Sequence, residues 1–461
     1  MPSAAQTYAN AIRPLLRPGP AKAQALAQAL QVSQPTVSRA LSALGDEVVP
    51  FGAARSIQYT LRDPQRADLQ ATVYRVTPQG ALETLGTLVP VCPQGFVMVE
   101  AGGARLHSDG LPWWIYDMRP QGYLGRAYCQ RHGQPLGLPE RLGDWSDTHA
   151  LRAILDQGDD MPGNLLIGPT ARDQFVNAPD PVPIAAAQKR HTYAQLADLA
   201  ARGEVAGSSA AGEQPKFTAY AEQADGTAAH VMVKFTAELD TPVSARWRDL
   251  LLAEHIALQV LRDHGVPAAQ SMTWMHGTQR FLEVQRFDRL GARGRRALHS
   301  FAALDAEFVG SGGNWPVIAR ALWKSGVITP QAFDTACLLW AFGTLIGNTD
   351  MHSGNLSCLS EGRRPYGLAP AYDMTPMAFA PTVGGGLPER SLELTVGEQV
   401  SAAAWKEALA MALVFVRRLG DEDGFSAGFD ACKAELVRHV TVANERVGRL
   451  AVSSDSRLRM Q

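Results

Sequence analysis

The pattern of hydrophobic and polar positions in the first 65 residues predicts two helices followed by a hairpin. In "SQPTVSRALSAL" the apolar residues Val37, Leu41 and Leu44 recur at i, i+4 and i+7, which places them on one face of a helix. Ser33 suits the N-cap, where its hydroxyl would accept a backbone N–H bond, and a proline in the first turn is favourable. We therefore expect a helix over residues 34–44. The helical pattern "AKAQALAQAL" precedes it by about three residues, and "EVVPFGAARSIQYTLR" predicts the hairpin.

The rest of the chain changes from mixed patterns to helical ones. Strand-like stretches include "ATVYRV", "GFVMVEA", "HVMVKFTAE" and "QRFLEVQRFDR", while "SARWRDLLLAEHIALQVLRDHG" predicts a long amphipathic helix capped by Ser244. Beyond about residue 295 helices dominate, as in "TPQAFDTACLLWAFGTLIGN". We expect an α+β protein with a small domain over 1–65, closed by a turn or linker at 62–64, a mixed α/β lobe over 66–295 and a helical lobe over 296–461.

Composition limits the classes of protein that fit. The 461 residues are 46% hydrophobic and 19% charged, the balance of a soluble globular protein. A net charge of -2 argues against a protein that coats nucleic acid, so any DNA contact has to come from a local basic patch. Five well-separated cysteines without a CxxC pair favour free thiols in a reducing compartment. With no signal pattern and no apolar run long enough to span a bilayer, we expect a cytoplasmic protein without a membrane partner.

The polar face of the helix over 34–44 suits contacts with DNA. Residues 1–65 contain six Lys and Arg against three Asp and Glu, a local charge of +3. Two helices joined by a short turn and followed by a hairpin resemble a winged helix-turn-helix, whose second helix reads base edges. The candidate DNA-binding residues are Gln34, Thr36, Ser38, Arg39 and, at the hairpin tip over 52–55, Arg55 near a phosphate. A small helical domain that contacts only protein is the alternative.

The segment "GNTDMHSGN" carries the polar groups of a phosphoryl-transfer site. Such enzymes use an Asp beside the acceptor hydroxyl and, five positions later, an Asn that binds magnesium; Asp350 and Asn355 have this spacing. A further metal-binding carboxylate is offered by Asp373, 23 positions after Asp350, in "LAPAYDMTPM". Asn355 and Asp373 are hard oxygen donors, which Mg²⁺ prefers. His352 is by itself more typical of a structural hydrogen bonder.

Earlier residues offer the remaining parts of such a site. Lys234 lies among alternating apolar residues in "HVMVKF", where it would contact a phosphate, and Glu254 on the next helix would hold it. A lysine at a strand edge and an ordinary solvated glutamate are the alternatives. The loop "GSSAAGEQPKF" is rich in small residues whose N–H groups could cradle a phosphate, and Lys216 adds charge. It lacks the Walker pattern, and by composition alone it is also compatible with a linker.

The motifs "SAAGEQPKF", "VKF", "EVQRFDR", "GNTDMHSGN" and "AYDM", in this order, resemble the HipA family of bacterial serine/threonine kinases, the toxins of toxin–antitoxin modules. The resemblance spans roughly residues 80–450. It implies ATP and Mg²⁺ as cofactors, Asp350 as the catalytic residue, Asn355 and Asp373 as metal ligands, and Ser209 as an autophosphorylation site. It implies that ATP contacts Ala211, Gly212, Glu213, Gln214, Lys216, Lys234, Gln285, Arg286, Phe287, Asp288, His352, Asn355 and Tyr372. Of these, residues 285–287 would lie against the base, and Gln285 stands where the family commonly has Glu.

The resemblance also implies a function and partners. The expected activity is transfer of the ATP γ-phosphate to a serine of a protein, in known cases an aminoacyl-tRNA synthetase, with arrest of growth. An antitoxin is a possible partner. The N-terminal DNA-binding segment departs from typical members, which borrow DNA binding from a separate antitoxin. Two other classes stay open: a nucleotide-sensing transcriptional regulator with an inactive kinase-like domain, and a metal-dependent nuclease.

Overall fold

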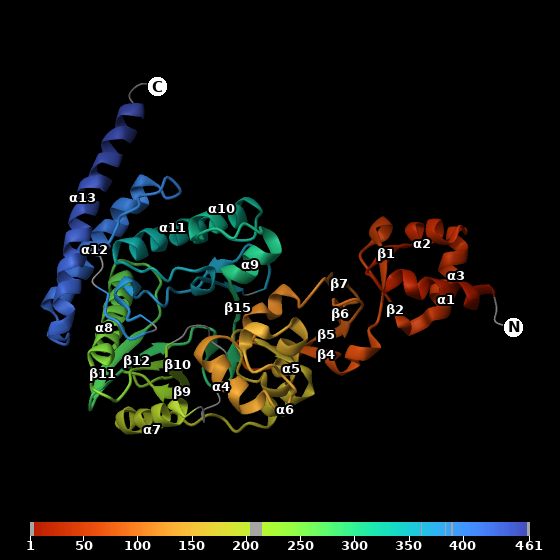
Figure 1. Cartoon of the computed structure of the whole chain (residues 1–461), viewed down its shortest axis with the longest axis horizontal. Helices are drawn as coiled ribbons and strands as arrows, with labels where there is room; N and C mark the ends of the chain where they lie inside the picture. Colours follow the sequence, from red (N-terminus) through yellow and green to blue (C-terminus); the bar gives the residue numbers. More distant parts are fainter. Residues whose placement is uncertain (1–3, 203–213, 361, 383, 389–390, 459–461) are drawn as a thin grey trace. The chain divides into compact units, whose positions relative to one another are not determined.

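The computed structural model describes residues 4–202, 214–360, 362–382, 384–388 and 391–458. The chain divides into two compact units (Figure 1). Unit 1 comprises residues 1–120 and 132–179, and unit 2 comprises residues 121–131 and 180–461. The expected lobe over 66–295 is therefore shared between the two units. It contains two separate sheets, each with its own apolar core, which strand patterns alone do not distinguish.

The first part of unit 1 contains the expected helix pair and hairpin. Its elements are α1 (Ala4–Leu16), β1 (Ala21–Lys22), α2 (Ala23–Leu30), α3 (Gln34–Leu44), β2 (Val48–Phe51) and β3 (Gln58–Leu61), and the antiparallel sheet has the order β1-β3-β2. The helix over 34–44 is confirmed, with Val37, Leu41 and Leu44 buried in one cluster with α1 and α2. Ser33 is the N-cap residue, but the predicted bond to a backbone N–H is wrong. The Ser33 hydroxyl instead lies 3.0 Å from the hydroxyl of Thr36.

The second part of unit 1 is an antiparallel sheet covered by helices. The strands are β4 (Ala71–Val76), β5 (Leu82–Pro90), β6 (Phe96–Glu100), β7 (Arg105–Ser108) and β8 (Leu165–Ile167), in the order β7-β6-β5-β4-β8. Helix α5 (Asp147–Gln157) precedes β8, and α6 (Gly168–Asn177) follows it. Residues of α5, β4, β5 and β6 share one buried cluster, so this sheet has an apolar core of its own.

The junction after the hairpin, predicted as a turn or linker over residues 62–64, is a packed connection. The N–H of Asp63 donates to the carbonyl of Pro90, and β2 shares an apolar cluster with β5 and β6. Arg66 pairs with Asp63 at 2.7 Å and donates to three main-chain carbonyls, those of Val91, Gln94 and Gly95. The helix pair and the following sheet are therefore joined by hydrogen bonds and by a common core.

Replacing Arg66 by Met should lower the stability of unit 1. The substitution removes a charged donor from three carbonyls and from the poorly exposed Asp63 carboxylate, a loss of about 2–3 kcal/mol. Hydrogen exchange of β5 and β6 in the full-length chain measures the change. Arg75→Met is the matched control, because the Arg75–Glu83 pair is exposed and should contribute below ~1 kcal/mol. Equal protection in both variants would contradict the structural role of Arg66.

Unit 2 begins with a four-stranded antiparallel sheet between two helices. Its strands are β9 (Lys216–Glu222), β10 (Ala228–Phe235), β11 (Ser271–His276) and β12 (Gln279–Gln285), in the order β11-β12-β10-β9. Helix α7 (Lys189–Ala201) packs on one face through a cluster that includes Tyr193 and Phe217, and α8 (Pro242–Asp263) packs on the other face through Leu251 (Figure 1). The long helix is confirmed, but its N-cap is Thr241; Ser244 is the third helical residue of a capping box.

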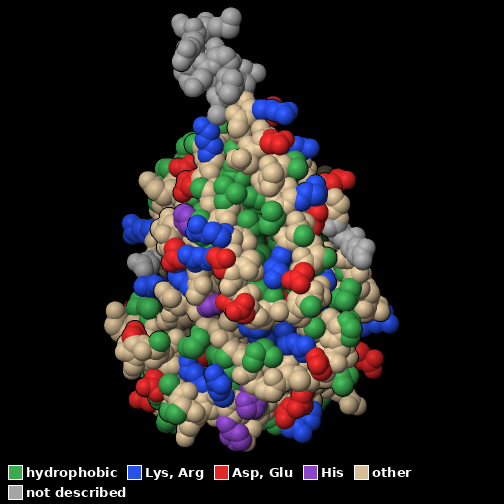
Figure 2. All heavy atoms as spheres, turned by 90° about the vertical axis from the view of Figure 1, so that its left-hand side faces the viewer, with side chains coloured by type: hydrophobic (Ala, Val, Ile, Leu, Met, Phe, Trp, Pro, Cys, Tyr) green, Lys and Arg blue, Asp and Glu red, His purple; other side chains and the backbone are tan. Residues whose placement is uncertain are grey.

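The remainder of unit 2 is mainly helical, as expected. It contains α9 (Phe301–Phe308), α10 (Trp315–Lys324), α11 (Pro330–Leu345), α12 (Ala402–Asp421) and α13 (Asp430–Leu458), with a small sheet of β15 (Ala297–Ser300), β16 (Ser357–Ser360) and β17 (Gly367–Leu368). Residues 122–131 of α4 (Gly122–His132) also belong to this unit. Figure 2 shows acidic, basic and hydrophobic side chains interspersed on one face of the molecule. Leu413 on α12 and Val437 on α13 are exposed.

Two further predictions concern the cysteines and the membrane. All five cysteines are free thiols, and four of them are buried. Among the described residues, no helix combines the length and the apolar character needed to cross a membrane.

Candidate functional site

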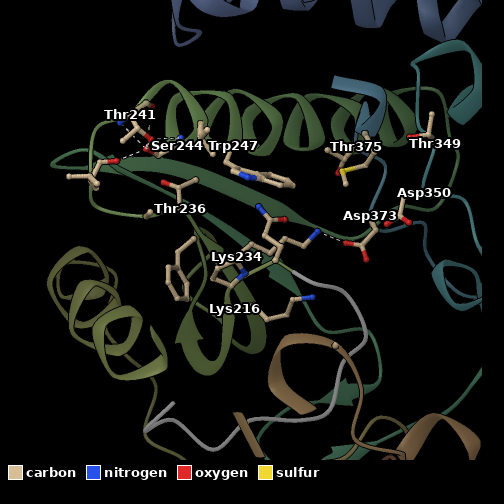
Figure 3. A pocket seen from close by; sticks show the side chains of 18 of the residues that line it. Lys216, Lys234, Thr236, Thr241, Ser244, Trp247, Thr349, Asp350, Asp373 and Thr375 are labelled. Atoms are coloured by element: carbon tan, nitrogen blue, oxygen red, sulfur yellow. Dashed lines mark hydrogen bonds and ion pairs between the residues drawn. The ribbon is translucent and has the colours of Figure 1, made fainter. Parts of the chain in front are cut away.

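A buried lysine joins the sheet, the helix above it and a distant loop. Successive residues of β10 point to opposite faces, so Val233 and Phe235 pack toward α7 while Lys234 points toward α8. There its Nζ lies 2.7 and 2.8 Å from the two carboxylate oxygens of Glu254, and it also forms an ion pair with Asp373 (Figure 3). The side chain of Lys234 is 8% exposed. The expected pairing of Lys234 with Glu254 is confirmed.

The charges of this cluster perturb one another. Burial lowers the pKa of Lys234, but Asp373 and Glu254 outweigh it, so the net shift is upward and the ammonium form is favoured. Burial raises the pKa of Glu254, whose carboxylate also accepts a hydrogen bond from the Thr375 hydroxyl at 2.9 Å. Although burial acts in the opposite direction, the ammonium groups of Lys234 and Lys216 lower the pKa of Asp373. The ionised Asp373 carboxylate attracts a cation, and the neighbouring ammonium group attracts an anion. Together they suit a ligand that contains both charges.

The loop after α11 is held by hydrogen bonds between its own residues and by bonds to Asp373 and Trp315. The Asn348 side chain donates to the main-chain carbonyl of Asp373 at 3.2 Å and accepts from the N–H of Asp350 at 3.0 Å. Asn355 donates its side-chain N–H to the carbonyl of Asp350 at 2.9 Å. The indole of Trp315 donates to the carbonyl of His352 at 2.9 Å. These bonds fix the backbone on both sides of Asp350 and leave its carboxylate half exposed.

Two aspartates of the site are in unusual states. Burial raises the pKa of Asp350, and the nearby Asp373 charge acts in the same direction, so Asp350 is a stronger base than an ordinary aspartate. Asp373 has a backbone φ of +52°, in the left-handed region that non-glycine residues rarely adopt. Such strain persists only where the surroundings enforce it, and it is common at functional sites.

A cavity of about 860 Å³ lies over these residues, within the range of small-molecule sites. Its lining includes six of the predicted site residues, namely Gln214, Lys216, Lys234, Asp350, His352 and Asp373. Figure 3 shows Lys234 directed toward Asp373, with Asp350 beside it. Residues far apart along the chain thus contribute to one cavity: for example, Lys234 and Asp373 are 139 positions apart.

The predicted contacts with the adenine base are only partly compatible with the structure. Residues Gln285, Arg286, Phe287 and Asp288 are not among the described residues that line this cavity. The N–H groups of Gln285 and Arg286 donate to main-chain carbonyls at 2.8 and 2.9 Å, so they are already used in pairing. The Asp288 carboxylate is buried against the guanidinium groups of Arg286 and Arg289. The Asp288 carboxylate thus takes part in an ion-pair network, and its place beside the nucleotide stays a prediction.

The remaining predicted residues fall into two groups. Ser209, Ala211, Gly212 and Glu213 lie outside the described residues. Asn355 and Tyr372 also do not line the cavity, but both lie at the loop that carries Asp350. The Tyr372 hydroxyl donates to the carbonyl of Gly354 at 3.0 Å, and its ring lies 5.6 Å from that of Phe287. Tyr372 thus supports the loop that carries Asp350.

Several residues that shape the site were not predicted. Thr375 bonds Glu254, Trp315 fixes the loop through His352, and Asn348 links Asp350 to Asp373. Asn348 could have been found, because an Asn two positions before another residue commonly accepts that residue's N–H. Nothing in the local sequence indicates that Trp315, 37 positions before His352, contacts this loop.

A metal ion fits the chemistry of this site. In the described part of the chain, no group of three or more His, Cys, Asp or Glu side chains forms a metal cage. Magnesium, however, commonly takes one or two protein carboxylates together with substrate phosphates. Asn355 uses its Nδ2 toward Asp350, and its Oδ1 accepts no hydrogen bond from another described residue. Asp373 supplies a carboxylate that is 25% exposed.

The candidate DNA-binding side chains lie on α3, in unit 1. Gln34, Ser38 and Arg39 are exposed, and Thr36 is half-buried. Arg55 belongs to the turn between β2 and β3, as expected for a hairpin tip, while its side chain lies outside the described part. The exposed polar row opposite the buried Val37, Leu41 and Leu44 is available to a partner.

Comparison with known proteins gives the relationship. Residues 67–176 match the profile of the YjjJ-like toxin middle domain, and residues 208–439 match that of the HipA-like C-terminal domain. The HipA-like match thus begins at residue 208, later than the resemblance over 80–450 suggested. The sequence is 39% identical to "Toxin YjjJ" of Escherichia coli (strain K12) over 439 residues, 95% of this chain and 98% of that protein. Because 95% of the chain aligns, much of the N-terminal part is shared with that relative.

A second curated protein and a solved structure are also similar to this chain. The sequence is 29% identical to the candidate kinase Y4dM of Sinorhizobium fredii (strain NBRC 101917 / NGR234), over 59% of this chain and 63% of that protein. The fold is similar to a chain from the Shewanella oneidensis MR-1 toxin–antitoxin complex of HipA, HipB and operator DNA, with a TM-score of 0.50 and 16% identity, over 82% of this chain and 99% of that chain. The chain belongs to the HipA-like family, and within it to the group of Toxin YjjJ.

Proposed function

We propose that this chain is an ATP-dependent protein serine/threonine kinase that acts as a growth-inhibiting toxin and binds DNA through its N-terminal part. The main support for kinase activity is Lys234, which forms ion pairs with Glu254 and Asp373 and lines the same cavity as Asp350. A lysine paired with a helix glutamate and a metal-binding aspartate is the arrangement that protein kinases require.

Each residue of the site has a distinct task in the proposed reaction. Lys216 and Lys234 contact the phosphates, and Asn355 with Asp373 hold Mg²⁺, which neutralises charge on the phosphate oxygens when it is bound. Asp350 accepts the proton of the acceptor serine hydroxyl, a task for which its raised pKa is favourable. The hydrogen bonds from Asn348 and Asn355 orient the backbone of Asp350, so its carboxylate needs little rearrangement.

The kinase proposal is tested with γ-labelled ATP and Mg²⁺. Label should appear on the wild-type chain and be lost in Asp350→Ala and, if Ser209 is the autophosphorylation site, in Ser209→Ala. Intact-mass measurement confirms that the label is a phosphoryl group. Binding of ATP by the wild type without any transfer would instead indicate a nucleotide-sensing regulator.

The nuclease alternative has weaker support. Two-metal nucleases hold their ions with several clustered carboxylates, and no such cluster occurs among the described residues. Degradation of plasmid DNA by the wild type, abolished in Asp350→Ala and without phosphate transfer, would favour that alternative.

The proposal of DNA binding rests on the architecture of the first 61 residues. The order α1-β1-α2-α3-β2-β3, with residues 31–33 joining α2 to α3, supports a winged helix-turn-helix, and α3 presents polar side chains. The structural neighbour from Shewanella oneidensis was solved with HipB and operator DNA, which supports DNA and an antitoxin as partners. By resemblance, the protein substrate is an aminoacyl-tRNA synthetase or another translation protein.

Replacing Arg39 by Ala should weaken DNA binding and reduce its salt dependence. Loss of one phosphate contact lowers the slope of log K against log salt by about 0.9. Titrations on a selected site at several salt concentrations measure this slope. Arg172→Ala, which removes an exposed arginine on α6 in the same unit, is the matched control and should leave the slope unchanged. An unchanged slope in Arg39→Ala would contradict the assignment of α3 to the DNA interface.

A further inference from the structure

A second cavity of about 540 Å³ adjoins the loop that carries Asp350. Asn348, Thr349 and Met351, on both sides of Asp350, line this second cavity, and Thr349 lines both cavities. Asp350 itself lines the first. Asp350, the proposed catalytic base, therefore lies between a cavity suited to the nucleotide and a second cavity with no assigned role.

The opposite wall of the second cavity is the segment over residues 391–399. Its odd-numbered residues Ser391, Glu393, Thr395, Gly397 and Gln399 all line the cavity, joined by Leu392. Leu394, in contrast, is buried. An alternation with period two is the pattern of an extended strand. The segment thus presents one side to the cavity over the length of several residues.

The other side of this segment is fastened to α13. The carbonyls of Leu392 and Leu394 accept hydrogen bonds from Arg438 at 3.1 Å and from Arg446 at 2.7 Å, and the N–H of Leu392 donates to Glu435. The main-chain groups of Glu393 and Thr395 form no hydrogen bond with another described residue. A fixed extended segment with unpaired N–H and C=O groups is a template for an added strand.

The charge of the second cavity indicates the preferred side chain. Its lining contains two ionisable residues, Glu393 and His439. His439 is buried and contacts the carbonyl of Thr344, and burial lowers its pKa, so it stays neutral at physiological pH. Exposed Glu393 therefore leaves the cavity with a negative charge. A basic side chain is the complement of that charge.

We infer that the second cavity binds the acceptor segment of the substrate protein, as an extended strand along residues 391–396 with a Lys or Arg near the acceptor serine held by Glu393. This inference rests on the proposed kinase activity and names the substrate class. Main-chain pairing with the edge of the segment gives affinity, and Glu393 gives specificity. The serine then reaches Asp350 across Thr349, opposite the nucleotide.

The test uses the full-length chain with ATP, Mg²⁺ and a positional-scanning library of serine-centred peptides. The wild type should prefer Lys or Arg over Asp or Glu at one position within about four residues of the serine, by roughly three- to tenfold. This range adds the attraction of Glu393 for a basic side chain to its repulsion of an acidic one, each with the energy of an exposed ion pair. Glu393→Lys should reverse that preference and leave the KM for ATP unchanged. Glu398→Lys is the matched control, because Glu398 is exposed on the same segment but does not line the cavity.

N-methylation of the peptide backbone tests the strand itself. Methylation of alternate residues should reduce phosphorylation, while methylation of the residues between them should be tolerated. An unchanged preference in Glu393→Lys, a uniform response to methylation, or a wild type that phosphorylates itself but no peptide would each overturn the docking inference. A different result would contradict the kinase proposal itself, namely the absence of any phosphate transfer from ATP to the chain or to a peptide.

Discussion

Asp350→Asn should lower kcat for phosphate transfer by about 10²–10⁴-fold, the usual contribution of a general base. The asparagine has nearly the same shape but cannot take up the proton of the acceptor hydroxyl. The bonds that position residue 350 involve its main chain, the N–H to Asn348 and the carbonyl to Asn355, so they persist in the variant. The Kd for ATP should therefore stay within about threefold of the wild-type value.

Rapid-quench transfer assays and calorimetric titration of ATP separate the two effects. The matched control is Asp334→Asn, which changes an exposed aspartate on α11, the helix that precedes the loop. The control should leave both kcat and Kd unchanged. If Asp350→Asn transferred phosphate at the wild-type rate, Asp350 would not be the base, and the proposed reaction would need another acceptor for the proton.

Lys234→Met should destabilise unit 2 by about 3–5 kcal/mol, the cost of removing one partner of a buried ion pair. Lys234 compensates two carboxylates, of which Glu254 is almost fully buried. Without the ammonium group both acids stay in the cleft without their cation. The same variant should also lose phosphate transfer, because the phosphate contact and the placement of Asp373 depend on Lys234.

The stability loss in Lys234→Met should depend on pH. Burial already raises the pKa of Glu254, and removal of Lys234 raises it further. A folded-state pKa above the unfolded value, about 4.3 for Glu, means that stability is lost as the pH rises through the folded pKa. The difference from wild type should thus be smaller at pH 5 than at pH 8.

Hydrogen exchange of α8 in the full-length chain reports this difference. Lys324→Met, at the exposed end of α10, is the control and should change stability by less than about 0.5 kcal/mol at either pH. A larger loss at pH 5 than at pH 8 would contradict the role assigned to Lys234.

The parts of the site that depend on local pattern could be predicted from the sequence. The spacing of Asp350 and Asn355 indicated a loop with two polar groups, and the structure joins them through the Asp350 carbonyl. The alternation around Lys234 indicated a buried lysine, and its pairing with Glu254 followed because α8 comes next in the chain. Likewise, the periodicity of Val37, Leu41 and Leu44 defined the bounds of α3.

Other features depend on contacts that no local pattern encodes. Asp288 pairs with two neighbouring arginines, although it lies in a motif associated with the nucleotide. The alternation over residues 391–399 was not recognised as strand-like, because the segment has no partner strand among the described residues. Both outcomes are decided by tertiary packing, which overrides local preference.

The central claim is that Asn355 and Asp373 hold one divalent ion beside the triphosphate, next to Lys234. The most direct measurement is a crystal structure with Mn²⁺ and a non-hydrolysable ATP analogue, in which anomalous scattering locates the ion. The account predicts an anomalous peak within ~2.5 Å of oxygens from both side chains, with the phosphates against Lys234. Nucleotide bound elsewhere, or an ion that neither side chain contacts, would contradict it.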